Sequence, residues 1–329
     1  MRTLPDPVTR ARDLVVPALE EAVARLEPTI REVVDYHLGL SAGNGGKALR
    51  PALACLSAEA VGAPAETAVD GAVAVELVHN FSLLHDDVMD RDEARHHRPT
   101  AWTVFGEARA ILAGDALSTL SLQVLLDRPG EERVQAAALV AEATAQMISG
   151  QAQDLALEGK PGVTVAECLE MIARKTAALL SCSSAVGAVL AGADEDIVQA
   201  LEAFGQHLGI AFQAVDDLLG IWGLPEVTGK PVGNDLRQKK NSLPVAAVLD
   251  RGGGEARELL EVLSVPELSD ADVERATSLV ERGGGREYAA EEANRQLELA
   301  LARLEQAPLE PGPRGEHAEL ARFITEREF

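Results

Sequence analysis

Helical periodicity runs through almost the whole of this 329-residue chain and limits the possible folds more than any other feature. Long stretches are rich in Ala and Leu and repeat apolar residues at positions i, i+3 and i+4. Examples are AALVAEATAQMISGQAQDLALE, MIARKTAALLSCSSAVGAVLAG and VQALEAFGQHLGIAFQAVDDLL. Several are apolar almost all round, as expected of central helices in a large bundle. No alternating strand of convincing length appears, so the sequence predicts an all-α protein.

The domain organisation is predicted from how the candidate functional stretches are spread. A chain of this length could form two domains. Gly and Pro cluster at 252–254, 283–285 and 308–313, but none of these clusters makes a long polar linker. The candidate functional stretches extend from residue 45 to residue 244, so one site would need most of the chain. We predict a single domain over residues 1–329, with about 250–329 as its peripheral C-terminal helical part.

Charge and cysteine content bear on partners and location. The net charge of −23 argues against nucleic acid or anionic lipid as a partner. No secretory signal opens the chain and no window holds 18 uninterrupted apolar residues, so we expect no transmembrane segment. Cys55, Cys168 and Cys182 lie far apart in apolar contexts, without disulfide or metal-ligand spacing. We therefore expect buried thiols and a cytoplasmic protein.

The first candidate site is the apolar stretch ELVHNFSLLHDDVMD at 76–90, which ends in acidic residues. At about 100° per residue, His79, Ser82, Asp86 and Asp90 fall within one arc of a helix. Two carboxylates one turn apart therefore point the same way. They either form a solvated helix end or bind a hard metal through oxygen.

A second acidic pair, Asp216-Asp217, follows 130 residues later in GQHLGIAFQAVDDLLGIWG. Unpaired carboxylates on a buried-looking helix are costly unless they are neutralised. Two such helices facing each other would form an oxygen-lined cage for several divalent ions. The alternative is two unrelated helix ends.

Two basic segments accompany the acidic pairs. Residues 44–51 join a glycine turn to a new helix, with Lys47 and Arg50 placed to cradle an anion. Residues 228–244 combine glycines, Pro231 and three lysines in a basic loop that suits a lid over a polyanion. Ordinary surface loops are the alternative reading of both segments.

Together these stretches resemble the trans-isoprenyl diphosphate synthases (polyprenyl synthetases), of a short-chain type similar to bacterial geranylgeranyl and farnesyl diphosphate synthases. The resemblance covers nearly the whole chain. It rests on eight motifs in order: GGKALRP (45–51), ELVHNFSLLHDDVMD (76–90), RHHRPT (95–100), AGD (113–115), GQAQDL (150–155), RKTAAL (174–179), FQAVDDLLG (212–220) and GKPVGNDLRQKKNSLP (229–244).

The resemblance implies a bundle around a central cavity, usually in a homodimer. It implies that isopentenyl diphosphate condenses with an allylic diphosphate (dimethylallyl, geranyl or farnesyl) by ionisation, attack and proton loss. Three Mg²⁺ ions are expected as cofactor, with Mn²⁺ as a substitute. They and cationic side chains would stabilise the departing diphosphate.

The resemblance also assigns roles to individual residues. Asp86, Asp90 and Asp216 would bind the metal, with Asp87 and Asp217 shaping the cage from behind. The allylic diphosphate would be held by Arg95, Lys175, Lys230 and Lys240, and isopentenyl diphosphate by Lys47, Arg50, His79 and His96. Lys175, Thr176 and Gln213 would act at the reacting centre.

Two positions depart from the family pattern, and two bear on product length. Gly220 stands where the second motif usually ends in Asp, so we expect function to survive with weaker order behind the metal ligand. His96 stands where the family has Arg and is charged only part of the time near neutral pH, so we expect it to hold isopentenyl diphosphate more weakly. Phe81, five residues before Asp86, would form a floor under the growing chain, and small Ser82 would leave depth above it. This pattern favours a geranylgeranyl over a farnesyl product.

Two other functions are alternatives to prenyl diphosphate synthesis. A class I terpene cyclase normally shields cations with many aromatic rings, but aromatics are only 3% of this chain. A non-catalytic diphosphate-binding subunit would be favoured by lost metal ligands, yet Asp86, Asp90 and Asp216 are all present.

Overall fold

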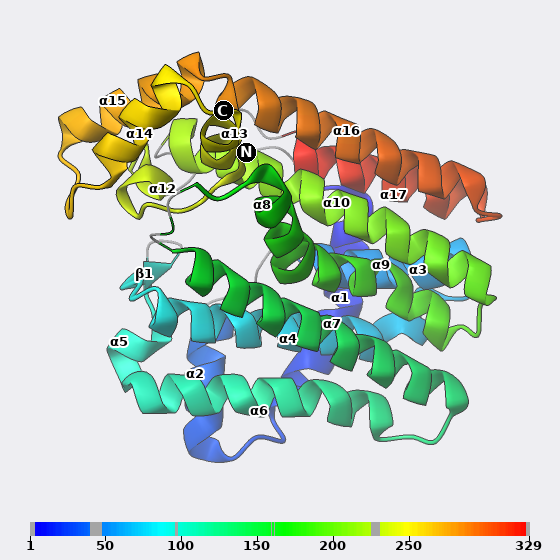
Figure 1. The fold of residues 1–329 in the computed structure, drawn as a ribbon. Helices are drawn as coiled ribbons and strands as arrows, with labels where there is room; N and C mark the ends of the chain where they lie inside the picture. The colour runs from blue at the N-terminus through cyan, green and yellow to red at the C-terminus, as the bar shows by residue number, and fades with distance from the viewer. Residues whose placement is uncertain are drawn as a thin grey trace. The chain divides into compact units, whose positions relative to one another are not determined.

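The computed structural model describes residues 4–39, 48–95, 98–158, 160, 162–224 and 231–326. These residues are mostly helical, which confirms the predicted fold class (Figure 1). By their contacts they divide into two compact units. Unit 1 comprises Met1–Thr144, Leu179–Gly205 and Arg303–Leu320, and unit 2 comprises Ala145–Ala178, Gln206–Ala302 and Ala321–Phe329. The single domain over 1–329 stays a prediction.

The elements of unit 1 are mostly N-terminal. They are α1 (Asp6–Val23), α2 (Pro28–Leu38), α3 (Leu49–Ala60), η2 (Ala65–Ala68), α4 (Val69–Met89), β1 (Ala94–Arg95), β2 (Arg98–Pro99), α5 (Ala101–Phe105), α6 (Glu107–Leu126) and α9 (Ala178–Leu190). Helices α4 and α6 run side by side (Figure 1). Fully buried leucines such as Leu77, Leu84, Leu117 and Leu120 from these two helices supply much of the core of unit 1.

The elements of unit 2 are shorter. They are α8 (Val165–Ile172), η3 (Ala173–Ala177), α12 (Asn234–Arg237), α13 (Leu243–Arg251), α14 (Gly254–Leu263) and α15 (Asp270–Arg282). In the described part of the chain, five helices contribute residues to both units. They are α7 (Glu131–Leu157), α10 (Glu195–Trp222), α16 (Gly285–Gln306), α17 (Pro311–Thr325) and α9, of which only Ala178 belongs to unit 2. One apolar cluster of unit 2 gathers Cys168, Leu218 and Leu243, and another gathers Ile221, Leu236 and Leu259.

Local sequence explains where several helices begin. Thr164 and Glu167 form a reciprocal capping box at the start of α8, and Ser269 and Asp272 form one at the start of α15. Pro244 stands in the first turn of α13, where its missing N–H has no helical partner to lose.

One short hairpin interrupts the helices. Ala94 pairs with Pro99 and Arg95 with Arg98 in an antiparallel ladder directly after the first acidic motif. Strands of two residues are too short for an alternating pattern, so the sequence carries no signal for them. The hairpin matters because it carries Arg95.

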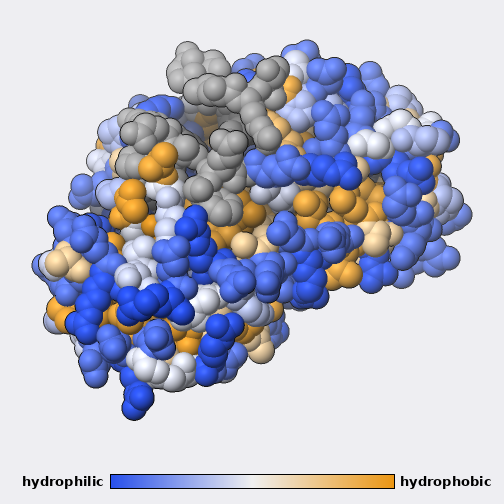
Figure 2. All heavy atoms as spheres, turned by 90° about the horizontal axis from the view of Figure 1, so that it is seen from above, coloured by the Kyte–Doolittle hydropathy of each residue, from blue (hydrophilic) through white to orange (hydrophobic). Residues whose placement is uncertain are grey.

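The surface and the cysteines agree with the composition. Hydrophilic side chains predominate on the face shown in Figure 2, with smaller hydrophobic groups between them. All three cysteines are free and buried, as predicted. Within the described residues, α6 alone is long and apolar enough to cross a membrane by length and composition, and 44% of its apolar window is buried. In unit 1 this helix packs against α4 and α2.

Candidate active site

The first acidic motif lies at the C-terminal end of α4, where Asp86 and Asp90 are one turn apart. The Asp90 N–H donates to the Asp86 carbonyl at 2.8 Å, so the backbone is still helical at Asp90. Both side chains are partly exposed, whereas Asp87 between them is only 2% exposed. The common face predicted for Asp86 and Asp90 is therefore present.

Asp87 holds Arg95 of the hairpin. Its Oδ1 accepts from Arg95 Nε at 3.0 Å and from Nη2 at 2.8 Å, and its buried Oδ2 has no hydrogen-bond partner among the described residues. Burial raises the pKa of Asp87, and the Arg95 guanidinium opposes that rise. A buried carboxylate holding a partly exposed arginine fixes where that arginine points.

Arg50 and His79 lie in the same unit, within electrostatic reach of each other. Arg50 stands in the first turn of α3, and its buried Nε has no partner in the described part of the chain. Burial holds the pKa of His79 well below its usual value, and the nearby charges of Arg50 and Arg95 lower it further. Three predicted diphosphate ligands thus gather here, while the predicted ligands Lys47 and His96 lie outside the described residues.

The two predicted chain-length residues follow one another on α4. Phe81 is 7% exposed, and the Ser82 hydroxyl donates to the carbonyl of His79 at 2.8 Å. Phe81 packs its ring against that of His85, one turn further along the same helix.

The second acidic pair, on α10 in unit 2, repeats the division seen in the first. Asp216 is exposed, whereas Asp217 is 7% exposed. Asp217 accepts from Gln213 Nε2 at 2.9 Å and from the Leu243 N–H at 2.8 Å. Burial raises the pKa of Asp217 to about 7, and the charges of Asp235 and Asp216 add to the rise. In each pair the first aspartate is accessible and the second is built into the protein.

The remaining predicted catalytic residues join this second acidic pair. The Thr176 hydroxyl donates to Gln213 Oε1 at 2.8 Å, which continues the chain from Asp217 and Gln213. Lys175 pairs with Asp154 of α7 at 2.5 Å. Both Lys175 and Thr176 lie in η3, a π-helical segment, and such segments are frequent at functional sites.

Close packing of backbones positions η3. A Cβ on Gly150 would lie 2.3 Å from the Lys175 nitrogen, and one on Gly209 would lie 2.4 Å from the Ala177 Cα. Only glycine lets α7 and α10 approach η3 this closely.

Gly220, where the family usually has Asp, is explained by a neighbour. A Cβ at this position would lie 1.9 Å from Oδ2 of Asp235, so the Asp235 carboxylate occupies the space of the missing side chain. A carboxylate is therefore present beside this end of the motif, but it comes from α12.

The predicted lid is only partly a loop. Residues 234–237 form helix α12, which is anchored because Leu236 is buried in an apolar cluster of unit 2. Lys240 is exposed after it, and its N–H donates to the Asp235 carbonyl at 2.9 Å. Lys230 lies outside the described residues.

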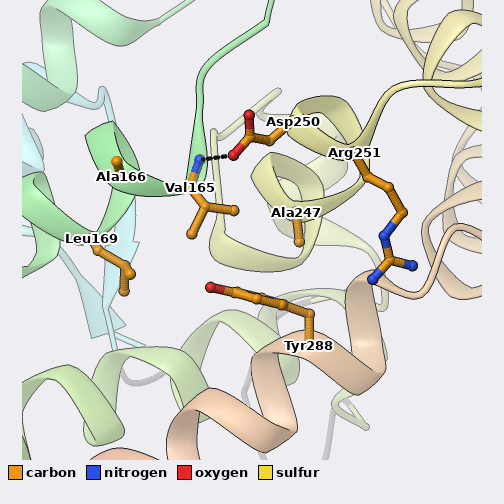
Figure 3. Close-up of a pocket in the computed structure, with 7 residues that line it drawn as sticks. All are labelled: Val165, Ala166, Leu169, Ala247, Asp250, Arg251 and Tyr288. Carbon is orange, nitrogen blue, oxygen red and sulfur yellow. Dashed lines mark hydrogen bonds between the residues drawn. The ribbon is translucent and has the colours of Figure 1, made fainter.

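No predicted site residue lines the open surface groove of unit 2 shown in Figure 3. This groove, of about 600 Å³, lies between α8, α13 and α16, with Asp250 accepting from the Val165 N–H at 3.1 Å.

Among the described residues, no three or more His, Cys, Asp or Glu side chains form a group that could hold a metal ion.

A comparison with known protein families shows to which family the chain belongs. A profile described as polyprenyl synthetase matches residues 27–280. The chain belongs to the polyprenyl synthetase family.

Individual relatives align with this chain over nearly its full length. The chain is 46% identical to a (2E,6E)-farnesyl diphosphate synthase of Mycobacterium tuberculosis, over 99% of this chain and 94% of that one. It is 44% identical to a geranylgeranyl diphosphate synthase of the same organism, over 92% and 89%. A polyprenyl synthetase structure from Streptomyces coelicolor matches with TM-score 0.93 and 48% identity, over 97% and 98%. This polyprenyl synthetase is thus a transferase of prenyl groups.

Sequence reasoning gave no role to three residues that the structure connects to the site. Asp154 stands in the quoted motif GQAQDL, yet its partner Lys175 is 21 residues away. Asp235 and His85 likewise contact residues that are distant in the sequence, Gly220 and Ile111 respectively. A signal was present in the glycines inside helical patterns, Gly114 and Gly150, because such glycines often mark close packing.

Proposed function

We propose that this polyprenyl synthetase condenses isopentenyl diphosphate with an allylic diphosphate in a Mg²⁺-dependent reaction. The observation that carries the proposal is the repeated division of labour in the two acidic pairs, where Asp86 and Asp216 are accessible and Asp87 and Asp217 are buried. The product would be a short all-trans prenyl diphosphate.

The donor set fits divalent metal bound with a substrate. It consists of carboxylate oxygens, which suit Mg²⁺ or Mn²⁺. Mg²⁺ is commonly held by one or two carboxylates together with substrate phosphates, so a preformed cage of three side chains is not required. We assign two ions to Asp86 and Asp90 and a third to Asp216. When bound, these ions would neutralise the charge that builds on the departing diphosphate.

Cationic side chains would bind and orient the diphosphates. Arg95, held by Asp87, and Lys175, held by Asp154, have fixed positions from which to grip the allylic diphosphate. Lys230 and Lys240 would reach it from the lid. A diphosphate oxygen would satisfy the orphan Nε of Arg50. His79, kept neutral by burial, would donate through a ring N–H, beside Lys47 and His96.

Thr176 and Gln213 would lie near the developing allylic cation. Because the Thr176 hydroxyl donates to Gln213, its remaining lone pair can point elsewhere, toward positive charge. The departing diphosphate would take the proton, so this mechanism needs no separate general base.

For product length we propose geranylgeranyl over farnesyl diphosphate. Phe81 would be the floor and Ser82 would leave room above it. Relatives of nearly equal identity carry both names, so overall similarity favours neither product.

We also propose a homodimer in the cytoplasm. On α6, Leu112 is 54%, Ile111 41% and Leu126 52% exposed. Such an apolar helix face suits a second copy of the chain. The free thiols suit a reducing compartment.

Incubation with Mg²⁺, isopentenyl diphosphate and each allylic primer tests the proposal. We expect linear prenyl diphosphates that a chelator abolishes, with twenty-carbon products predominating. A cyclised hydrocarbon would support a terpene cyclase, and no product from any primer would support a non-catalytic subunit. Either result would overturn the proposal.

The variant Asp86→Ala tests the assignment of Asp86 as a metal ligand. We expect it to lower turnover about 10³-fold while the protein stays folded. Asp13→Ala, which removes an exposed carboxylate from α1, is the control and should keep wild-type turnover. Equal turnover in the two variants would contradict the assignment of Asp86. Circular dichroism and unfolding midpoints establish folding.

A further inference from the structure

His85 lies between the predicted floor and the predicted metal ligands, yet it has no role in the mechanism above. It directly precedes Asp86 and stands four residues after Phe81 on α4, so Phe81 and His85 share one face of that helix. Their ring centroids are 4.9 Å apart and the rings meet at 77°, an edge-to-face pair. The imidazole therefore supports the Phe81 ring from one side.

The His85 ring is itself fixed to the neighbouring helix. Its Nε2 lies 3.0 Å from the carbonyl oxygen of Ile111 in α6. Since a carbonyl only accepts, this nitrogen carries the proton and donates it. A carboxylate oxygen, Asp115 Oδ1, is 3.8 Å from the same nitrogen, beyond hydrogen-bond distance. The anchor is thus a backbone atom of a long helix.

Gly114 provides the seat for this ring. A Cβ at residue 114 would lie 2.3 Å from His85 Nε2 and 2.4 Å from Cδ2. No residue but glycine allows the imidazole to lie against α6 at this distance. Glycine inside a helix lowers stability by about 0.5–1 kcal/mol relative to alanine. The contact with His85 is a reason for a glycine at this position despite that cost.

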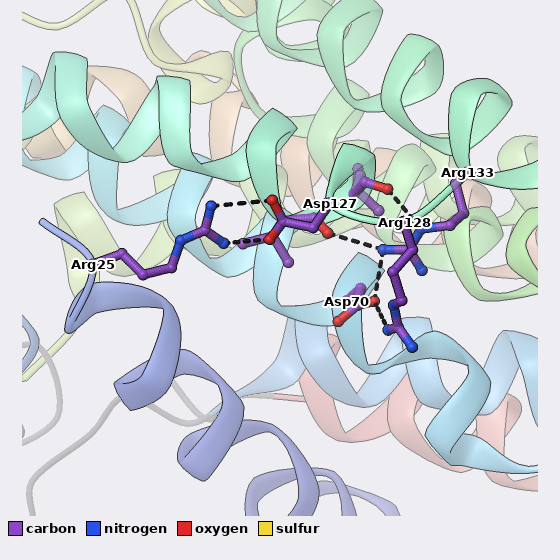
Figure 4. A network of polar contacts seen from close by, with 7 residues as sticks. Arg25, Asp70, Asp127, Arg128 and Arg133 are labelled. Atoms are coloured by element: carbon purple, nitrogen blue, oxygen red, sulfur yellow. Dashed lines mark hydrogen bonds and ion pairs between the residues drawn. The ribbon is translucent and has the colours of Figure 1, made fainter. Parts of the chain in front are cut away.

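At their other ends, α4 and α6 are linked through Arg133 of α7 (Figure 4). Asp70 in the first turn of α4 accepts from Arg133 at 2.7 Å and from Arg128. Arg133 also donates to the carbonyls of Leu125 and Val124 at the end of α6. The support behind His85 is therefore a helix held to α4 at both ends.

From this geometry we infer that His85 is a positioning residue for product length, which holds the Phe81 ring in place while a growing prenyl chain presses on it. The inference rests on the proposed function, because it takes Phe81 as the floor. An aromatic side chain yields by rotating about its side-chain bonds, and the anchored imidazole blocks that rotation. Gly114 acts in the same device because it lets the imidazole reach α6.

The test measures the chain lengths of the products of five single variants and one double variant. In His85→Ala we expect the share of products longer than the wild-type product to rise about 3- to 10-fold, the effect of losing one aromatic pair. Gly114→Ala should raise the same share although it alters neither ring, because the added methyl displaces the imidazole. His85→Phe, which keeps a ring beside Phe81, should stay closer to the wild-type distribution than His85→Ala.

Gly71→Ala is the matched control. Gly71 lies on the same helix and is also crowded, because an added Cβ would lie 2.9 Å from side-chain atoms of Leu190 and Val186. It is 14 residues from His85 in the sequence. This variant should lower stability without lengthening the product. If it lengthens the product as much as Gly114→Ala, general loosening of α4 explains the effect and the inference fails.

The double variant separates the inference from its premises. Phe81→Ala alone should lengthen the product, and adding His85→Ala should lengthen it no further, because the ring to be held is gone. If Phe81→Ala lengthens the product and both His85→Ala and Gly114→Ala leave it unchanged, the positioning role is wrong. If Phe81→Ala has no effect, the floor is wrong, and a wild-type protein without condensation activity would instead overturn the proposed function.

Discussion

At the scale of single residues, burial determines what each ionisable group can do. Asp87 is adjacent to Asp86 but is nearly inaccessible, so it serves to hold Arg95. His79 and His317 are both histidines on helices, and burial holds the pKa of each below its ordinary value. A residue's type therefore predicts its chemistry only together with its surroundings.

His317 supports a prediction about pH. Its ring is fully buried against Phe204, its Nδ1–H donates to the Pro313 carbonyl, and its Nε2 has no partner among the described residues. Burial lowers its pKa from 6.5 to about 4. Because the unfolded chain binds the proton first, the stability that neutral His317 gives is complete above pH 6.5 and is lost as the pH falls to about 4.

From pH 7 to pH 4 this loss is about 3 kcal/mol. Urea unfolding at several pH values measures it, with His317→Leu as comparison. The free energy of unfolding of the wild type should fall by that amount more than that of the variant. Parallel curves for the two proteins would show that His317 does not titrate in this way.

At the scale of elements, glycines determine which helices come close. Gly150 and Gly209 admit η3, Gly114 admits His85, and Gly220 admits the carboxylate of α12. Each contact joins residues from separate parts of the chain. The helices could form without these glycines, but they could not pack in the same way.

Gly220→Asp, which restores the usual family residue, should therefore destabilise this protein. The new side chain would collide with Asp235 and place a second carboxylate beside it, a cost of about 1–3 kcal/mol. Combining it with Asp235→Gly should recover most of that loss, because the carboxylate then comes from α10 instead of α12. Thermal unfolding of the single and double variants measures both effects.

The control is Gly315→Asp in α17, where an added Cβ meets nothing within 4 Å. It adds the same charge to a helix without a collision and should change stability less. If Gly220→Asp were no less stable than Gly315→Asp, the structural reason given for the glycine would be wrong.

At the scale of the whole molecule, the proposed homodimer places the exposed apolar face of α6 at the contact between two chains. The chain mass is 34.8 kDa, so a dimer should sediment at about 70 kDa. Leu112→Arg puts a charge on this face and should give a monomer. Val265→Arg, at a 40% exposed position in unit 2, is the control and should remain dimeric. Sedimentation that is unchanged by Leu112→Arg would exclude this face as the contact.

Much of the molecule was readable from the chain alone. The all-α class, the helices that carry the acidic pairs and the buried thiols follow from periodicity and composition, which are local properties. The motif order also led to the family that the profile match confirms. The sequence did not predict the two-residue strands, the π-helical segment or helix α12. Each of these elements is shorter than the windows in which a pattern can be recognised.

The amino-acid sequence by itself determined which segments are helical and which of their residues we propose as ligands of metal and diphosphate. Only the tertiary structure decided that Asp87 holds Arg95, that Asp235 takes the space beside Gly220, and that His85 lies on Gly114. The reason is physical: helix formation depends on neighbours within a turn or two, whereas these contacts depend on which faces of distant segments are packed together.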